Sequence, residues 1–144
     1  MKTYADTGLL LSLYLPETTS AAAVAIVQAL NEPLPLTPLI LLELRNGLNL
    51  ALYRQRITAA ERAAAWSKVQ ADIGGGLLVQ TPVATADLHA KAAELSDRHA
   101  AALGTRTLDI LHVAAALLLG AREFLSFDEK QRRMAAAEGM KARP

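Results

Sequence analysis

The sequence has 144 residues, the size of one ordinary domain, and 52% of them are hydrophobic, which allows a packed core and excludes a disordered chain. It contains no cysteine, which excludes disulfides, thiolate zinc sites and a cysteine nucleophile. The net charge of +1 argues neither for nor against nucleic-acid binding. Because Lys2 brings charge too early for a signal peptide and the apolar run 110–120 is too short for a membrane span, we expect a soluble cytoplasmic protein.

In the first half of the chain, short apolar runs alternate with longer helical patterns. Pro16 should stop the first helix, and Pro38 suits the first turn of a later one. Thr58 and Glu61 have the spacing of a capping box. The predicted elements, in chain order, are a strand at 2–6, a helix at 8–15, a helix capped by Thr19 or Ser20 that continues to 30, a strand at 34–37, a helix at 38–55 and a helix at 58–72.

The second half continues the alternation. Thr107 can cap a helix, and Gly120 can stop it. Short strands between longer helices predict a single α/β domain over 1–144, with three layers and a short-stranded, mainly parallel central sheet flanked by helices. The predicted elements are a flexible break at 74–76, a strand at 77–80, a helix at 86–99, a helix at 107–119, a strand at 123–126, a helix at 129–138 and an edge strand at 140–143.

Acidic residues stand at the end of, or inside, apolar runs that should be buried: Asp6, Glu43, Asp109 and Asp128. A carboxylate seldom lies beside a core unless a cation neutralises it. In parallel α/β sheets the ligand site lies at the carboxyl ends of the strands, and the topology allows these acids to converge there. The oxygen ligands and the small number of histidines favour a hard cation, Mg²⁺ or Mn²⁺, over a softer metal.

The same acids could serve a different chemistry or a purely structural role. The tripeptide at 6–8, Asp-Thr-Gly, is the signature of aspartic proteases, but the apolar helical run at 9–11 does not suit a β-rich protease. Each acid alone could have an ordinary structural role: a helix cap for Asp6 and Asp128, an ion pair with Arg45 for Glu43, and an ion pair with Arg106 for Asp109.

Three more side chains are candidates for contact with a substrate. Arg45 and Arg106 lie within three residues of acids and could bind phosphate, although an ordinary solvated surface would also account for them. His112 lies one turn after Asp109 on the same helix face. It could touch substrate or donate to a carboxylate, and the alternative is a satisfied histidine at the edge of the core.

The segments around the acids resemble four motifs of a known family. They are Tyr-Ala-Asp-Thr-Gly at 4–8, Leu-Glu-Leu-Arg-Asn-Gly-Leu at 42–48, Thr-Arg-Thr-Leu-Asp-Ile-Leu-His-Val-Ala-Ala-Ala at 105–116 and Phe-Leu-Ser-Phe-Asp-Glu-Lys-Gln at 124–131. Their order and spacing resemble the PIN (PilT N-terminus) domain family, and the length is similar to that of VapC-type toxins. The resemblance covers nearly the whole chain.

The resemblance implies a Rossmann-like PIN fold and an Mg²⁺-dependent endoribonuclease, with Mn²⁺ as a possible substitute. VapC-type members cut structured RNA, commonly tRNA or rRNA, are held inactive by a VapB-type antitoxin, and usually form homodimers. The expected function is therefore the toxin of a type II toxin–antitoxin pair. Two alternatives stay open: a PIN nuclease of RNA processing without an antitoxin, and a non-catalytic interaction module that keeps the fold.

By the same resemblance, Asp6 and Asp109 are the main metal ligands. Glu43 is a ligand or a base that acts through water, and Asp128 holds metal directly or through water. Thr7 and Ser126 are expected to orient carboxylates through their hydroxyls. The chain departs from the family where Gly8 replaces the usual Ser or Asn, and where Ser126 replaces the usual Thr; neither change removes an acid.

Overall fold

The computed structural model describes residues 2–144, so Met1 of the predicted domain 1–144 lies outside the described residues. These residues form two compact units, one made of 2–6 with 82–144 and the other of 7–81. No helix within residues 2–144 combines the length and apolar character that a bilayer span requires.

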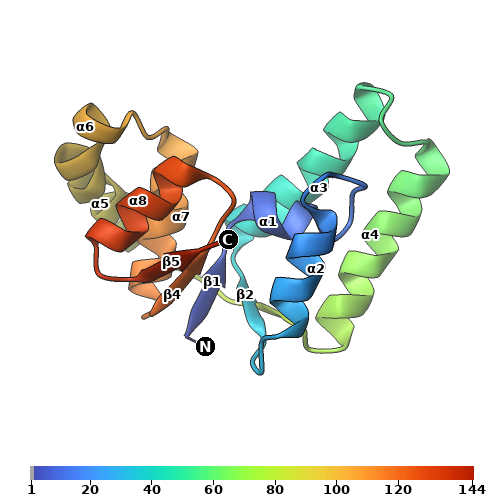
Figure 1. The fold of residues 1–144 in the computed structure, drawn as a ribbon, viewed down its shortest axis with the longest axis horizontal. Coiled ribbons are helices and arrows are strands. Elements are labelled where there is room, and N and C mark those ends of the chain that lie inside the picture. Colours follow the sequence, from blue (N-terminus) through green and yellow to red (C-terminus); the bar gives the residue numbers. More distant parts are fainter. Residues whose placement is uncertain (1) are drawn as a thin grey trace. The chain divides into compact units, whose positions relative to one another are not determined.

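The first unit is built on a parallel sheet. Its strands are β1 (Thr3–Ala5), β4 (Glu123–Leu125) and β5 (Lys141–Arg143), with β4 between the other two (Figure 1). Ala5 is paired with Leu125, and Leu125 with Arg143, so the carboxyl ends of the strands are level. The predicted strands at 2–6, 123–126 and 140–143 are confirmed with slightly narrower bounds, and β5 is the predicted edge strand.

Helices of the first unit cover this sheet. They are α5 (Thr85–Leu95), the π-helical turn η1 (Ser96–Ala100), α6 (Ala101–Leu103), α7 (Thr107–Leu118) and α8 (Glu129–Ala137). α5 packs against α7, and α8 packs against α7, β4 and β5. The predicted end of the helix at 99 is wrong, because the chain stays helical to Leu103. The helical segment ends at Gly104, which adopts the left-handed φ of +65° that glycine tolerates.

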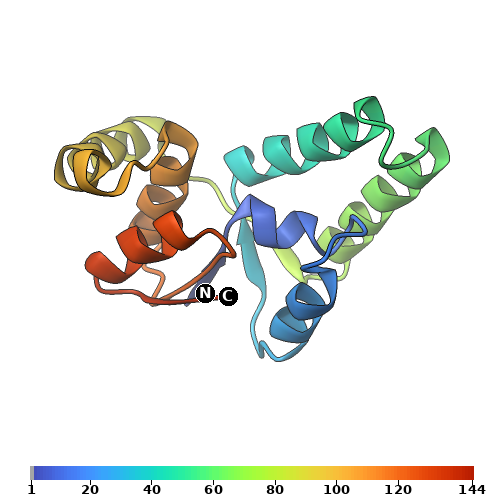
Figure 2. The same ribbon diagram turned by 45° about the horizontal axis from the view of Figure 1, so that its top comes forward.

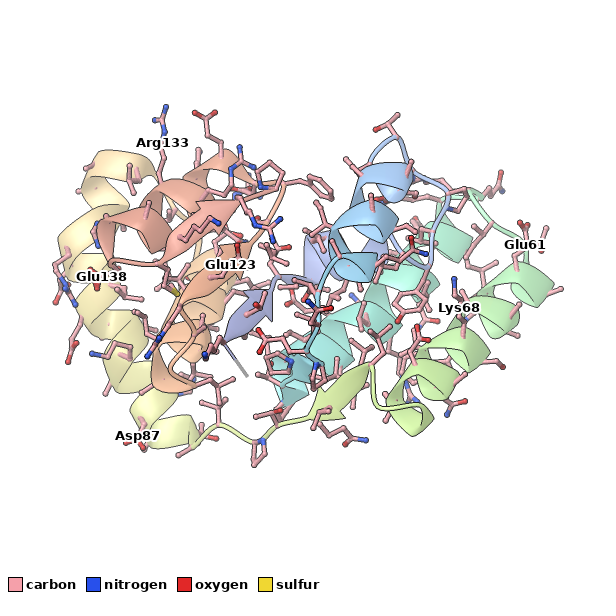
Figure 3. The ribbon with its side chains drawn as sticks, turned by 60° about the horizontal axis from the view of Figure 1, so that its bottom comes forward. Glu61, Lys68, Asp87, Glu123, Arg133 and Glu138 are labelled. Carbon is pink, nitrogen blue, oxygen red and sulfur yellow. The ribbon has the colours of Figure 1, made fainter. Side chains whose placement is uncertain are left out.

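An ion pair links the central strand to the edge strand. Arg143 donates to Glu123 through Nε, and this hydrogen bond is the main cause that lowers the pKa of the Glu123 carboxyl (Figure 3 labels Glu123). A carboxyl whose pKa is lowered by folding stabilises the protein above its unfolded pKa of about 4.3, and loses this effect as the pH falls through the folded pKa.

We therefore expect Glu123→Gln to lower the urea midpoint at pH 7 and to match the wild type more closely at pH 3. The matched control is Glu129→Gln on α8, whose partner Arg133 is 64% exposed, so that the pair is screened by solvent. A midpoint difference for Glu123→Gln that stays the same at both pH values would contradict this account.

The second unit contains α1 (Thr7–Leu11), α2 (Ser20–Gln28), β2 (Leu34–Leu36), α3 (Pro38–Tyr53), α4 (Ala59–Gly74) and β3 (Leu78–Gln80). β2 and β3 pair in parallel. The long helices α3 and α4 pack against each other and are joined by a short loop (Figure 2). α1 crosses α3 closely at Gly47, where an added Cβ would lie 2.7 Å from a methyl carbon of Leu11.

Helix boundaries in the second unit differ from prediction in several places. The first helix ends at Leu11 rather than 15, because the Leu13 and Tyr14 amides bond the carbonyls three residues back, those of Leu10 and Leu11, in tighter turns. The break predicted at 74–76 instead begins at Gly75, because Gly74 is still helical.

One predicted helix cap is confirmed and another is not. Thr58 and Glu61 form the predicted capping box, and Glu61 is labelled at the start of α4 in Figure 3. Thr19 occupies the cap position of α2 but makes no capping bond through its side chain, and Ser20 instead donates to the Leu15 carbonyl. The Ser20 hydroxyl is thus used by the preceding turn.

Candidate active site

Two predicted site residues directly follow neighbouring strands of the first unit. Asp6 follows β1, Ser126 follows β4, and the Asp6 amide donates to the Leu125 carbonyl at 3.0 Å. The Ser126 hydroxyl donates to Asp6 Oδ2 at 2.6 Å. Asp6 is 4% exposed, so this bond holds a nearly buried carboxylate at the carboxyl edge of a parallel sheet. The Ser126 hydroxyl thereby fixes one of the two carboxylate oxygens of Asp6.

The loop after β4 brings a second acid next to Ser126. The Asp128 amide donates to Ser126 Oγ at 2.9 Å, and Arg132 donates to the Ser126 carbonyl through Nη1. Asp128 Oδ1 accepts from the Gln131 amide at 2.9 Å, so Asp128 caps α8 as its structural alternative predicts. The capping bond uses one carboxylate oxygen.

The third acid of this unit is joined to the same network by Gln131, a residue that the sequence did not single out. Asp109 lies in the first turn of α7, and its Oδ1 accepts from Gln131 Nε2 at 2.7 Å. Its Oδ2 is 3.4 Å from the Arg106 amide, a long backbone contact. Hydrogen bonds therefore run from Asp6 through Ser126, Asp128 and Gln131 to Asp109. Gln131 lies within the motif segment 124–131, which is the only sequence signal that could have pointed to it.

Glu43 belongs to the second unit. It lies half-buried on α3, and the Thr7 hydroxyl donates to its Oε1 at 2.9 Å. Thr7 begins α1 and is the residue after Asp6 in the chain. The Thr7 hydroxyl thereby fixes one of the two carboxylate oxygens of Glu43.

A cleft of about 500 Å³ in the first unit is bordered by both acidic and basic side chains. Asp109 and Asp128 line it together with Arg106 and Lys130. Arg106 and Lys130 are both exposed to solvent. A cleft with carboxylates and cations on its walls can bind a metal ion and a phosphate group side by side.

The donor atoms of this unit fit a hard divalent cation. Within residues 2–144, no three His, Cys, Asp or Glu side chains form a ready metal-binding group. The carboxylates are instead connected through Ser126 and Gln131. The available donors are all oxygens, which is the ligand type that Mg²⁺ and Mn²⁺ prefer. Gln131 Oε1 is a buried oxygen without a hydrogen-bond partner in the described part of the chain, an acceptor that a cation or its water could satisfy.

Two of the three substrate-contact candidates have other contacts. His112 is 3% exposed, and its Nδ1 lies 2.9 Å from the Tyr4 hydroxyl, which favours the alternative of a core histidine. The Arg45 guanidinium lies 4.5 Å from the centre of the Trp66 ring, which indicates a cation–π contact in the second unit. Of the three candidates, Arg106 is the one that lines the cleft with acids.

Fold and site together define an α/β protein with parallel strands and with acids that follow or flank the strands of one sheet. A family model described as PIN domain matches residues 3–137. The chain belongs to the PIN domain family. No curated protein matches this sequence at a significant level.

Solved structures of similar fold cover nearly the whole length of the chain. FitAcB from Neisseria gonorrhoeae has a TM-score of 0.70 at 18% identity, covering 99% of this chain and 96% of that one. VapC20 from Mycobacterium tuberculosis, a sarcin–ricin loop cleaving toxin, has a TM-score of 0.70 at 20% identity, with 99% of each chain covered. VapBC2 from Rickettsia felis, solved bound to a DNA fragment from its promoter, has a TM-score of 0.67 at 13% identity, with coverages of 99% and 98%. The predicted fold class is thereby confirmed.

Proposed function

We propose that this protein is a metal-dependent endoribonuclease and the toxin of a type II toxin–antitoxin pair. The observation that carries the proposal is the hydrogen-bonded series from Asp6 to Asp109, which ends at a cleft shared with Arg106 and Lys130. A phosphodiester carries negative charge, so its hydrolysis requires neutralisation of that charge and a strong nucleophile. Acids that hold a cation, next to basic side chains that hold phosphate, supply the first requirement.

In this proposal Asp6 and Asp109 are the main ligands of Mg²⁺ or Mn²⁺, and Asp128 holds the ion directly or through water. When bound, the ion would polarise the phosphoryl oxygen and acidify a water molecule. Ser126 keeps the Asp6 carboxylate in one orientation through its 2.6 Å hydrogen bond, so that the ligand is in place before the ion arrives. Glu43, held by Thr7, is a further ligand or a base that acts through water.

The substrate-binding role falls to the cations at the cleft. Arg106 can bind a phosphate through two parallel hydrogen bonds, and Lys130 supplies a mobile point charge beside it. Both contacts are to the RNA backbone, so they would bind many sequences alike. The RNA itself, tRNA or rRNA in this proposal, would then be selected by its shape and by its single-stranded loops.

Partners form the second part of the proposal. VapC20 is a toxin, and VapBC2 was solved bound to a DNA fragment from its promoter. By analogy, we propose a VapB-type antitoxin and a homodimer for this chain. Growth arrest on expression, relieved by co-expression of a small DNA-binding protein encoded beside it, would support the toxin. Cleavage activity without growth arrest would favour RNA processing instead.

Metal titration tests the enzymatic part. We expect calorimetry to show Mn²⁺ and Mg²⁺ binding to the purified protein, and we expect EDTA to abolish cleavage of a labelled RNA until excess Mg²⁺ is restored. Bound metal should also raise the unfolding temperature, since a ligand that binds only the folded state stabilises it. Absence of metal binding together with absence of growth arrest would overturn the proposal in favour of a non-catalytic module.

A further inference from the structure

Gln131 is buried in a place where a glutamine ordinarily stays in solvent. It lies in the first turn of α8, directly after Lys130 and before two arginines, yet it is 5% exposed. Burial of an amide costs free energy unless both its nitrogen and its oxygen are bonded. The burial of Gln131 therefore needs contacts that compensate for this cost.

Gln131 bonds two carboxylates at once. Its Nε2 donates to Asp109 Oδ1 at 2.7 Å, and its backbone amide donates to Asp128 Oδ1 at 2.9 Å. Asp109 comes from α7 and Asp128 from the loop before α8, so one residue sets the spacing of two acids from different elements. The bond to Asp109 also sets the orientation of the side-chain amide, because the opposite orientation would place an oxygen against a carboxylate.

The side-chain oxygen of Gln131 is not satisfied in the same way. With Nε2 committed to Asp109, Oε1 is buried and has no hydrogen-bond partner among residues 2–144. Buried amide oxygens are nearly always bonded, so an unpartnered oxygen on the side chain that donates to Asp109 points to a ligand at this position. That ligand must be a cation or a donor such as water, because an anion would be repelled by this oxygen and by both acids.

We propose that Gln131 is a positioning residue of the metal site, holding Asp109 and Asp128 in register, and that its Oε1 accepts the divalent cation or a water molecule bound to it. This inference rests on the proposed function, because it needs a cation at these acids. The proposed metal site would then contain a neutral amide oxygen in addition to its carboxylates.

Gln131→Met tests the inference, because methionine has a similar length but neither donates nor accepts strongly. In the full-length protein we expect Mn²⁺ affinity, measured by calorimetry, to fall about 10- to 100-fold. We expect the unfolding temperature in EDTA to stay close to that of the wild type, because removal of the unpartnered Oε1 offsets the loss of the Nε2 donor to Asp109. A purely structural glutamine would show the reverse pattern, with a lower unfolding temperature and unchanged Mn²⁺ affinity.

Gln131→Glu provides a second test that does not depend on the first variant folding. It keeps an oxygen acceptor, removes the donor and adds a negative charge next to Asp109. We expect a lower unfolding temperature in EDTA and recovery of that temperature as Mn²⁺ is added. Failure of Mn²⁺ to restore it would overturn the proposal. The matched control is Gln70→Met on an exposed face of α4, which should leave both measurements unchanged.

The role of Gln131 and the proposed function fail in different ways. If the wild type binds no Mn²⁺, the proposed function fails and the role of Gln131 fails with it. If the wild type binds Mn²⁺ and Gln131→Met binds it equally well, the role of Gln131 alone is overturned.

Discussion

Asp6→Asn should abolish RNA cleavage, by at least ~100-fold, and leave the protein folded. Asparagine has the same shape as aspartate and can still accept the hydrogen bond that Ser126 donates to Oδ2. It lacks the negative charge that attracts a divalent cation. Because asparagine keeps the volume of this 4% exposed side chain and its hydrogen bond with Ser126, the variant should keep the fold.

The measurement is cleavage of a labelled RNA at controlled Mg²⁺, together with thermal unfolding of the same sample. Asp87→Asn serves as the matched control, because Asp87 is an exposed acid in the first turn of α5 (labelled in Figure 3). The control should cleave like the wild type. Wild-type activity of Asp6→Asn under metal-controlled conditions would remove Asp6 from the site and undermine the nuclease proposal.

Phe124→Ala should lower the free energy of unfolding by ~3–5 kcal/mol. Phe124 lies in the middle of β4, the central strand of its sheet, and is fully buried. Its ring stacks on that of Tyr4 with the centroids 5.7 Å apart. Truncation leaves a cavity beside the Tyr4 ring, on the buried face of the sheet. Since a domain has only about 5–15 kcal/mol of total stability, the variant should be close to unfolding at 37 °C.

Urea unfolding gives this value, and the chain supplies its own control. Phe127 lies three residues later, just beyond the end of β4, and is only partly buried. Phe127→Ala should cost clearly less, because the smaller buried area leaves a smaller cavity. Equal losses for the two variants would show that burial in β4 does not control stability here.

Agreement between prediction and structure is closest where the signals are local. The strands beginning at Thr3 and Glu123 were predicted from short apolar runs, and the capping box of Thr58 from a spacing of three residues. Such signals depend on neighbours in the chain, so the sequence contains them in full. The position of Asp6 at the carboxyl edge followed from the end of its predicted strand.

Helix ends were predicted less well, because competing local bonds decide them. The first helix stops at Leu11, well before Pro16, where the next amides bond carbonyls three residues back. The helix that begins at Thr85 passes His99 through a π-helical turn and ends at Gly104. Residue types alone do not show which of several stop signals, such as a proline or a glycine, ends a helix.

The chemistry of the acids was readable from residue types and motif order, since carboxylates beside apolar runs and the PIN resemblance need no coordinates. The hydrogen bonds that connect the acids could not be predicted in this way. Gln131 stands in a run of charged residues that looks solvent-exposed, and its burial arises because α8 packs against α7 and β4. His112 shares a helix face with Asp109, yet it lies in the core bonded to Tyr4, 108 residues away in the chain. Contacts between distant residues depend on how side chains fill space, and a linear pattern does not encode that directly.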